Sequence, residues 1–146
     1  MLQRDYPGQV CSIARALGVV GDRWTLLVVR DVGLGVHRFE DLQASLGIAT
    51  NVLSDRLKRL VDEGIFERVQ YRERPPRSEY RLTEKGRDLR VALLALMQWG
   101  DRYSMEAPPR VARRRSDGAP VSVRLVAEDG SPVAPGDLVL EPGPGA

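Results

Sequence analysis

The stretch "FEDLQASLGIATNVLSDRLKRLVDEGIFERVQYRERPPRSEYRLT", residues 39–83, decides the fold. Its first half holds two apolar stripes at helical spacing, each followed by a glycine that can end a helix, Gly47 and Gly64. The stripe residues are Phe39, Leu42 and Leu46 in the first helix, and Leu53, Leu57 and Leu60 in the second. Two short helices joined by a three-residue turn are typical of a helix-turn-helix.

The second of these helices, residues 50–63, carries a polar face opposite its leucines. At 100° per residue this face consists of Asn51, Asp55, Lys58 and Asp62, flanked by Ser54 and Arg59. In a helix-turn-helix the second helix enters the DNA major groove, where its first residues meet base edges. We therefore interpret residues 50–63 as a recognition helix. Asp55 and Asp62 oppose phosphate, and Asp55 is placed to orient Arg59 or to accept from cytosine.

After Gly64 the apolar period changes from 3.6 to 2, which favours β-strands. "IFERVQY" and "SEYRLT" flank the step Pro75–Pro76, and because proline cannot donate a ladder hydrogen bond, the middle must be a loop. Residues 68–81 contain five arginines and two glutamates, a net charge of +3. A charged turn alone would be solvated, its arginines paired with Glu73, Glu79 or nothing. Directly after a helix-turn-helix it is predicted to be a wing, residues 72–78.

Helices are also predicted on both sides of this stretch. "CSIARALGVV" is predicted to form a helix that Gly21 ends in the left-handed conformation. Asp22 is then expected to cap a central helix reaching about residue 32. Thr83 is expected to cap a long helix over residues 84–104. That last helix is apolar nearly all round, which favours burial against a second subunit. The alternative is a helix clasped by the first helix and tail of its own chain.

These elements define the expected fold class: mainly α, or α+β, a winged helix-turn-helix with a long C-terminal dimerisation helix and a small β-hairpin-like tail. The expected DNA-binding and dimerisation domain is 1–106, and a linker follows at 107–120. The tail, 121–146, contains an Asp129–Gly130 turn signal. It is expected to pack on the body or on a partner subunit, or to be partly disordered.

Composition excludes several classes of site. The chain of 146 residues has a net charge of +2, one cysteine and one histidine. It can therefore form neither an intramolecular disulfide nor an ordinary His/Cys metal site. There is no secretory signal, no membrane-length apolar run, no Gly-rich phosphate loop and no catalytic set of nucleophile and base. We expect a cytoplasmic protein that is not an enzyme and needs no cofactor or metal.

Three motifs, "GDRWTLLVVRD", "LSDRLKRLVDEGI" and "YRERPPRSEYRLTEKG", resemble the HxlR-type (DUF24) winged helix-turn-helix regulators of bacteria. The resemblance covers residues 10–104 and implies a homodimeric transcriptional regulator, more commonly a repressor. It implies that the first and last helices form the dimer interface and that the dimer binds two half-sites of an operator, as MarR regulators do. Ala49 departs from the serine that often caps the recognition helix, so either Thr50 or a shifted helix start replaces that cap.

The expected partner is double-stranded DNA, with a small-molecule effector between subunits, near Trp24 and Trp99, left open. The predicted DNA-binding residues are Thr50, Asn51, Ser54, Lys58, Arg59, Arg74 and Arg77. One alternative is a winged-helix module for protein–protein contact. Another is a thiol sensor acting through Cys11, since some relatives sense oxidants through a cysteine near this place. Cys11 lies just before the first helix, where the helix dipole favours a thiolate, but it would equally fit as a small packing residue.

Overall fold

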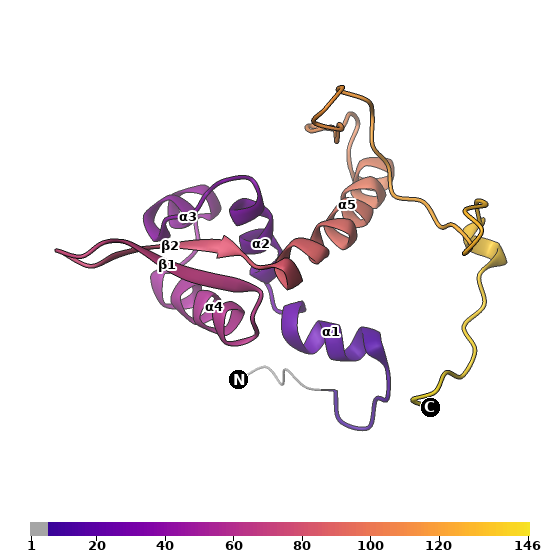
Figure 1. The fold of residues 1–146 in the computed structure, drawn as a ribbon, viewed down its shortest axis with the longest axis horizontal. Coiled ribbons are helices and arrows are strands. Elements are labelled where there is room, and N and C mark those ends of the chain that lie inside the picture. The colour runs from indigo at the N-terminus through magenta and orange to yellow at the C-terminus, as the bar shows by residue number, and fades with distance from the viewer. Residues whose placement is uncertain (1–5) are drawn as a thin grey trace. The chain divides into compact units, whose positions relative to one another are not determined.

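The computed structural model describes residues 6–146 and confirms the α+β arrangement (Figure 1). Its elements are α1 (Ser12–Val20), α2 (Thr25–Gly33), α3 (Phe39–Leu46), α4 (Thr50–Asp62), β1 (Phe66–Arg72), β2 (Arg77–Leu82), α5 (Glu84–Ser104) and the 3-10 helix η1 (Pro135–Asp137). The chain forms two compact units, one ending at Arg90 and one starting at Val91.

The core of the first unit lies around α2, as its apolar sequence predicts. Three valines of this helix are almost fully buried, together with Leu42 of α3, the leucine stripe of α4 and the start of β1. The core side chains are Val28, Val29, Val32, Leu42, Ile48, Leu53, Leu57, Leu60, Ile65 and Phe66. The predicted stripe of α4 is therefore confirmed. Burial of such side chains stabilises a fold by about 1.5–3 kcal/mol each.

One buried carboxylate, Asp31, joins α2 to α3. Its Oδ2 accepts a hydrogen bond of 2.6 Å from Ser45 Oγ, and its Oδ1 accepts one of 2.8 Å from Arg30 Nε. The charge is thus paired and hydrogen-bonded, which is what a buried carboxylate requires. This contact fixes the first helix of the helix-turn-helix against the core.

The junction of α1 and α2 differs from the prediction in two respects. Gly21 is right-handed, with φ −80°, and the left-handed residue is Trp24, with φ 81°. Glycine is nevertheless required at position 21, because a Cβ atom would collide with the carbonyl oxygen of Leu17. Asp22 does not cap α2. Its carboxylate instead lies 3.6 Å from Arg59 Nη1 and 4.0 Å from Arg56 Nε, both on α4.

The hairpin pairs β1 with β2 in antiparallel register, from Phe66 opposite Leu82 to Arg72 opposite Arg77, with a bulge after Gln70. His37, in the segment before α3, is hydrogen-bonded to β2. The amide of Tyr80 donates to the carbonyl of His37 at 2.9 Å, and His37 Nδ1 donates back to the carbonyl of Tyr80 at 2.9 Å. His37 is therefore a half-buried residue that docks the hairpin.

Thr83 caps α5 as predicted, because its Oγ1 accepts a hydrogen bond of 3.1 Å from the amide of Gly86. The same hydroxyl donates to the carbonyl of Ile65 at 3.1 Å. The helix also spans the predicted residues, 84–104. Its first turn is thereby bonded to the start of the wing within the first unit.

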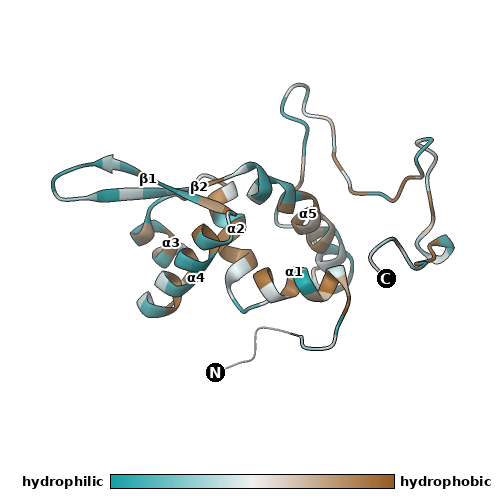
Figure 2. Cartoon of the chain, turned by 60° about the horizontal axis from the view of Figure 1, so that its bottom comes forward, coloured by the Kyte–Doolittle hydropathy of each residue, from teal (hydrophilic) through white to brown (hydrophobic). Residues whose placement is uncertain are grey.

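In the second unit, α5 contains hydrophobic residues (Figure 2), and several of its large apolar side chains are exposed. Val91 is 63% exposed, Trp99 63% and Tyr103 62%. The polar residue of this stretch, Gln98, has a separate task. Its side-chain amide donates to the carbonyl of Val123 and accepts from the Val123 amide. These two hydrogen bonds attach the tail to α5.

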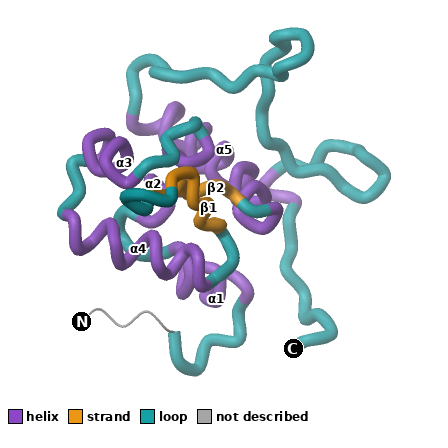
Figure 3. The backbone as a smooth tube through the Cα atoms, turned by 60° about the vertical axis from the view of Figure 1, so that its left-hand side comes forward, coloured by secondary structure: helices purple, strands orange, loops and turns teal. Residues whose placement is uncertain are grey.

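Residues 107–146 consist mainly of loops, with two isolated antiparallel bridges and the 3-10 helix η1 in place of continuous strands (Figure 3). Val126 pairs with Pro132 around the predicted Asp129–Gly130 turn, and Gly130 has φ 84°. A second turn lies within the predicted linker. There Arg114 binds Asp117 through two bonds of 2.9 and 2.7 Å, and this guanidinium lowers the pKa of the Asp117 carboxyl. Among residues 6–146, no helix is long and apolar enough to cross a membrane.

Candidate nucleic-acid interface

The turn between α3 and α4 is built from backbone geometry and one amide side chain. Gly47 ends α3 in the left-handed conformation, with φ 63°, and Ile48 is buried beneath the turn. Gln43 Nε2 donates to Thr50 Oγ1 at 2.7 Å. The hydroxyl of Thr50 therefore braces the turn, while Ala49 occupies the N-cap position without any side-chain cap. No replacement cap forms, and α4 begins at Thr50.

The polar face of α4 is exposed as predicted. Asn51, Ser54 and Lys58 are all exposed, on the side of the helix opposite its buried leucines. Lys58 Nζ donates to Asp62 Oδ2 at 3.0 Å, a solvent-exposed pair at spacing i, i+4 that holds the lysine only weakly. This face therefore offers an amide, a hydroxyl and a cation, the groups that read base edges and bind phosphates.

Arg59 and Asp55 do not behave as predicted. Arg59 is half-buried on the flank of α4, where Nη2 donates to the carbonyl of Gly18 and Nη1 faces Asp22. Asp55 pairs with Arg56 at 2.6 Å, so the expectation that Asp55 orients Arg59 is wrong. The physical reason is the α1–α2 junction, which lies along this flank and offers a carbonyl and a carboxylate to the long guanidinium.

The predicted wing is held on the first helix of the helix-turn-helix. Arg77 Nη1 donates to Glu40 Oε1 on α3 at 3.1 Å, a partner that was not among those predicted. Arg38 stacks on the ring of Tyr71, 4.7 Å from its centroid, and so ties the opposite strand to the same helix end. Arg74, at the tip, is exposed, and its side chain makes no hydrogen bond or ion pair to the part of the chain that the structure describes.

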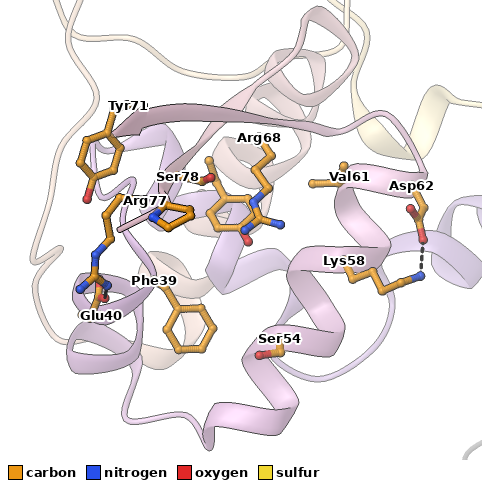
Figure 4. A pocket seen from close by; sticks show the side chains of 12 residues that line it. Phe39, Glu40, Ser54, Lys58, Val61, Asp62, Arg68, Tyr71, Arg77 and Ser78 are labelled. Atoms are coloured by element: carbon orange, nitrogen blue, oxygen red, sulfur yellow. Dashed lines mark hydrogen bonds and ion pairs between the residues drawn. The ribbon is translucent and has the colours of Figure 1, made fainter. Parts of the chain in front are cut away.

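A cleft of about 620 Å³ lies between the wing and the helices α3 and α4 (Figure 4). It brings together three of the predicted residues: Ser54, Lys58 and Arg77. It also contains Arg68 of β1, which the sequence analysis did not select. Side chains alternate between the two faces of a strand, and this alternation could have identified Arg68. Arg68 pairs in register with Tyr80, which also lines the cleft. Asn51 and Arg74 lie outside the lining, and Arg59 lines a different cavity.

The remaining predicted residue, Cys11, is a free and exposed thiol at the N-cap of α1. Residues 6–146 contain no cluster of three or more histidine, cysteine, aspartate or glutamate side chains suited to a metal ion. Trp24 is half-buried and stacks under Arg23 at 5.0 Å, whereas Trp99 is exposed beside Tyr103, with ring centroids 5.6 Å apart.

Comparisons with known proteins agree with this geometry. An uncharacterised HTH-type transcriptional regulator of Mycobacterium tuberculosis is 47% identical over 137 residues, which cover 92% of this chain and 87% of the relative. The solved structure of PA1607, described as a candidate transcription factor, is 41% identical, covers 92% of this chain and 96% of that one, and has a TM-score of 0.79. The reduced form of the transcriptional regulator YodB from B. subtilis is 30% identical, covers 66% and 96%, and has a TM-score of 0.56.

These relatives are transcriptional regulators rather than enzymes by their names. A family model described as HxlR-like helix-turn-helix matches residues 19–108, more than half of the chain and nearly all of the predicted DNA-binding region. The chain therefore belongs to the HxlR-like helix-turn-helix family.

Proposed function

We propose that this protein is a sequence-specific DNA-binding repressor that binds a pseudo-palindromic operator as a homodimer. In this proposal α4 lies in the major groove, with Asn51 and Ser54 at base edges. Arg74 at the wing tip contacts the backbone or the minor groove, and Thr50 and Arg59 stay secondary because both are engaged within the chain. The transcriptional regulators among its relatives support the same class of function.

The observation that carries the proposal is the charge of the cleft between α4 and the wing. Three cations from three elements line it: Lys58 of α4, Arg68 of β1 and Arg77 of β2. Two glutamate or aspartate side chains, Glu40 and Asp62, pair with Arg77 and Lys58. These are exposed surface pairs, worth at most about 1 kcal/mol each, so a phosphate can displace the carboxylates.

The proposed dimer rests on the apolar surface of α5. Leu96, Trp99 and Tyr103 are each more than half exposed, and so are Ile13 on α1 and Val91. Isolated apolar side chains on a surface are normal, but a row along one helix marks an interaction site. A two-fold dimer buries such a row against its own copy and sets two recognition helices about one helical turn of DNA apart, or a multiple of it.

The experiment that tests DNA binding is a gel shift against the DNA upstream of the protein's own gene and of its divergent neighbour. Specific retention should weaken steeply with salt, because each phosphate contact releases counterions. If a well-folded dimer retains no fragment in a salt-sensitive way, the regulator proposal fails. A winged-helix module for protein–protein contact would then be the better account of the fold.

The wing makes a separate prediction. The double variant Arg74→Ala, Arg77→Ala should bind the operator about a hundredfold more weakly, from two charged contacts of about 1.5 kcal/mol each. The slope of log K against log salt should fall by about two. The charge-matched control Arg110→Ala, Arg124→Ala removes two arginines whose side chains make no hydrogen bond or ion pair within residues 6–146 and which lie outside the cleft. Equal losses in both variants would show that net charge, not the wing, drives binding.

A second candidate function, thiol sensing, is favoured by the exposure of Cys11 at the start of α1. YodB from B. subtilis has been solved after treatment with diamide, and that structure is 29% identical to this chain. With a single cysteine, oxidation can join two subunits through a Cys11–Cys11 disulfide or form a mixed disulfide with a small thiol. We expect diamide to change operator affinity in the wild type and to have no effect on Cys11→Ser. A response that persists in Cys11→Ser removes the thiol from the mechanism.

A further inference from the structure

A second cavity of the first unit, about 510 Å³, lies away from the DNA-facing cleft. Its walls are segment 6–10, one side of α1 and the C-terminal part of α4. On α1 the lining residues are Ala14, Arg15, Gly18 and Val19. Ile13, the α1 residue proposed to meet a second subunit, does not line it. The cavity is therefore distinct from the cleft between α4 and the wing, and the residue it shares with the predicted DNA-binding set is Arg59.

The charged groups of this cavity favour an anion. Two guanidinium groups, those of Arg15 and Arg59, line it together with one carboxylate, that of Glu63. Arg59 uses Nη2 on the carbonyl of Gly18 and Nη1 on Asp22. A guanidinium has five N–H donors in a fork that matches a carboxylate, so Arg59 retains donors for a ligand. Arg15 makes no side-chain hydrogen bond or ion pair to any described residue.

The remaining lining defines the rest of the ligand. Pro7, Val10, Ala14 and Val19 give the cavity an apolar wall beside its two cations. Ligand sites commonly combine apolar walls with a few placed polar groups. An apolar body with a single carboxylate fits this pattern, whereas a phosphate ester or a polyol would leave the apolar wall unused.

Arg59 also has a structural role in the first unit. Arg59 and its neighbour Arg56 attach α4 to the α1–α2 junction, through the carbonyls of Gly18 and Arg23 and the carboxylate of Asp22. Both arginines share this attachment, and the Arg56 Nε to Arg23 carbonyl bond is 3.3 Å. A carboxylate bound to Arg59 would compete with the Gly18 carbonyl and change how α4 is held.

We propose that this cavity is an effector site for a small organic monocarboxylate with an apolar body, and that Arg59 transmits its occupancy to α4. The binding site stands independently of the DNA-binding proposal. Its effect on DNA affinity rests on the proposed function. The two parts are accordingly tested by separate measurements.

Binding is tested by NMR titration of the full chain with 3-phenylpropanoate, with 3-phenylpropanamide as the uncharged control. We expect saturable shifts of amides in segments 8–19 and 59–63 with the acid, and none with the amide. Arg15→Gln should weaken this binding about tenfold, and the matched control Arg124→Gln, outside the cavity, should leave it unchanged. No saturable shift, equal shifts from the amide, or unchanged affinity in Arg15→Gln overturns the site.

Transmission is tested by operator binding with and without the same acid. Coupling energies of 1–3 kcal/mol are typical, so we expect operator affinity to change about tenfold in the wild type. Arg59→Lys should keep the fold but reduce this change, because an ammonium cannot present the same fork. Saturable binding with no change in operator affinity overturns transmission while leaving the site. A wild type that binds no DNA even without the acid overturns transmission together with the proposed function, and the NMR result still decides the site.

Discussion

Replacing Trp99 by glutamate should convert the proposed dimer into a monomer and remove most of its operator affinity. Trp99 is 63% exposed on α5 and forms an aromatic pair with Tyr103. Large aromatic side chains at the centre of an interface dominate its binding energy. A glutamate there would place a carboxylate in the proposed apolar interface, where it would be desolvated without a partner.

The loss of DNA affinity should be large because, in the proposed dimer, binding of the second half-site is intramolecular. Linking two binding modules raises affinity by about 10²–10⁴ over one module, and a monomer forfeits that gain. Sedimentation should show a monomer, and a gel shift should show the corresponding loss. Ser104→Glu, which adds the same charge at an exposed position of α5 away from the apolar row, should leave both unchanged. A dimeric Trp99→Glu variant of normal affinity would exclude α5 as the interface.

The elements predicted from the sequence are those whose signals are local. The leucine spacing of α4, the glycines that end α3 and α4, and the Thr83 cap of α5 each involve residues within a few positions of one another. Periodicity and capping arise from the helix itself, so they can be read without knowing the rest of the fold.

Contacts between distant positions could not be predicted in this way. Asp22 has the sequence position of a helix cap but is paired with Arg56 and Arg59, more than thirty positions away. In the same way Arg77 binds Glu40, 37 positions earlier, rather than a glutamate of its own hairpin. Long charged side chains take whichever partner the tertiary fold brings within about 4 Å, and the sequence pattern does not contain that information.

This difference also separates the two arginines of the wing. Both were predicted from the same charge cluster, yet Arg77 is bound to α3 and faces the cleft, while Arg74 extends from the tip. Arg77 therefore holds its charge at a fixed place in the cleft, whereas the exposed Arg74 can contact DNA beyond the cleft. We expect the loss of either arginine to flatten the salt dependence of DNA binding. We expect the preference for one DNA sequence over another to change more when Arg77 is replaced, because Arg77 lies beside α4.

The largest effect on stability is expected from Gly86→Ala. Gly86 is buried in the first turn of α5, and a Cβ atom there would lie well under 3.0 Å from the carbonyl oxygen of Ile65 and 3.0 Å from Leu82 Cδ2. The Ile65 carbonyl cannot easily move, because it accepts a hydrogen bond from the amide of Thr83 and lies 3.1 Å from the Thr83 hydroxyl. Relief therefore requires α5 to shift from the wing, which breaks the Thr83 cap.

We expect a loss of about 3 kcal/mol, at the upper end for overpacking, and a fall in Tm of roughly 10 °C. Gly33→Ala is the matched control, since its Cβ would make only an ordinary contact of 3.5 Å with Leu82 Cδ1 at the end of α2. Thermal unfolding of both variants, followed by circular dichroism, measures the difference. If Gly86→Ala melts within a degree or two of the wild type, the first turn of α5 must be able to move away from the Ile65 carbonyl without loss of stability. The Thr83 cap would then not be the contact that fixes this turn.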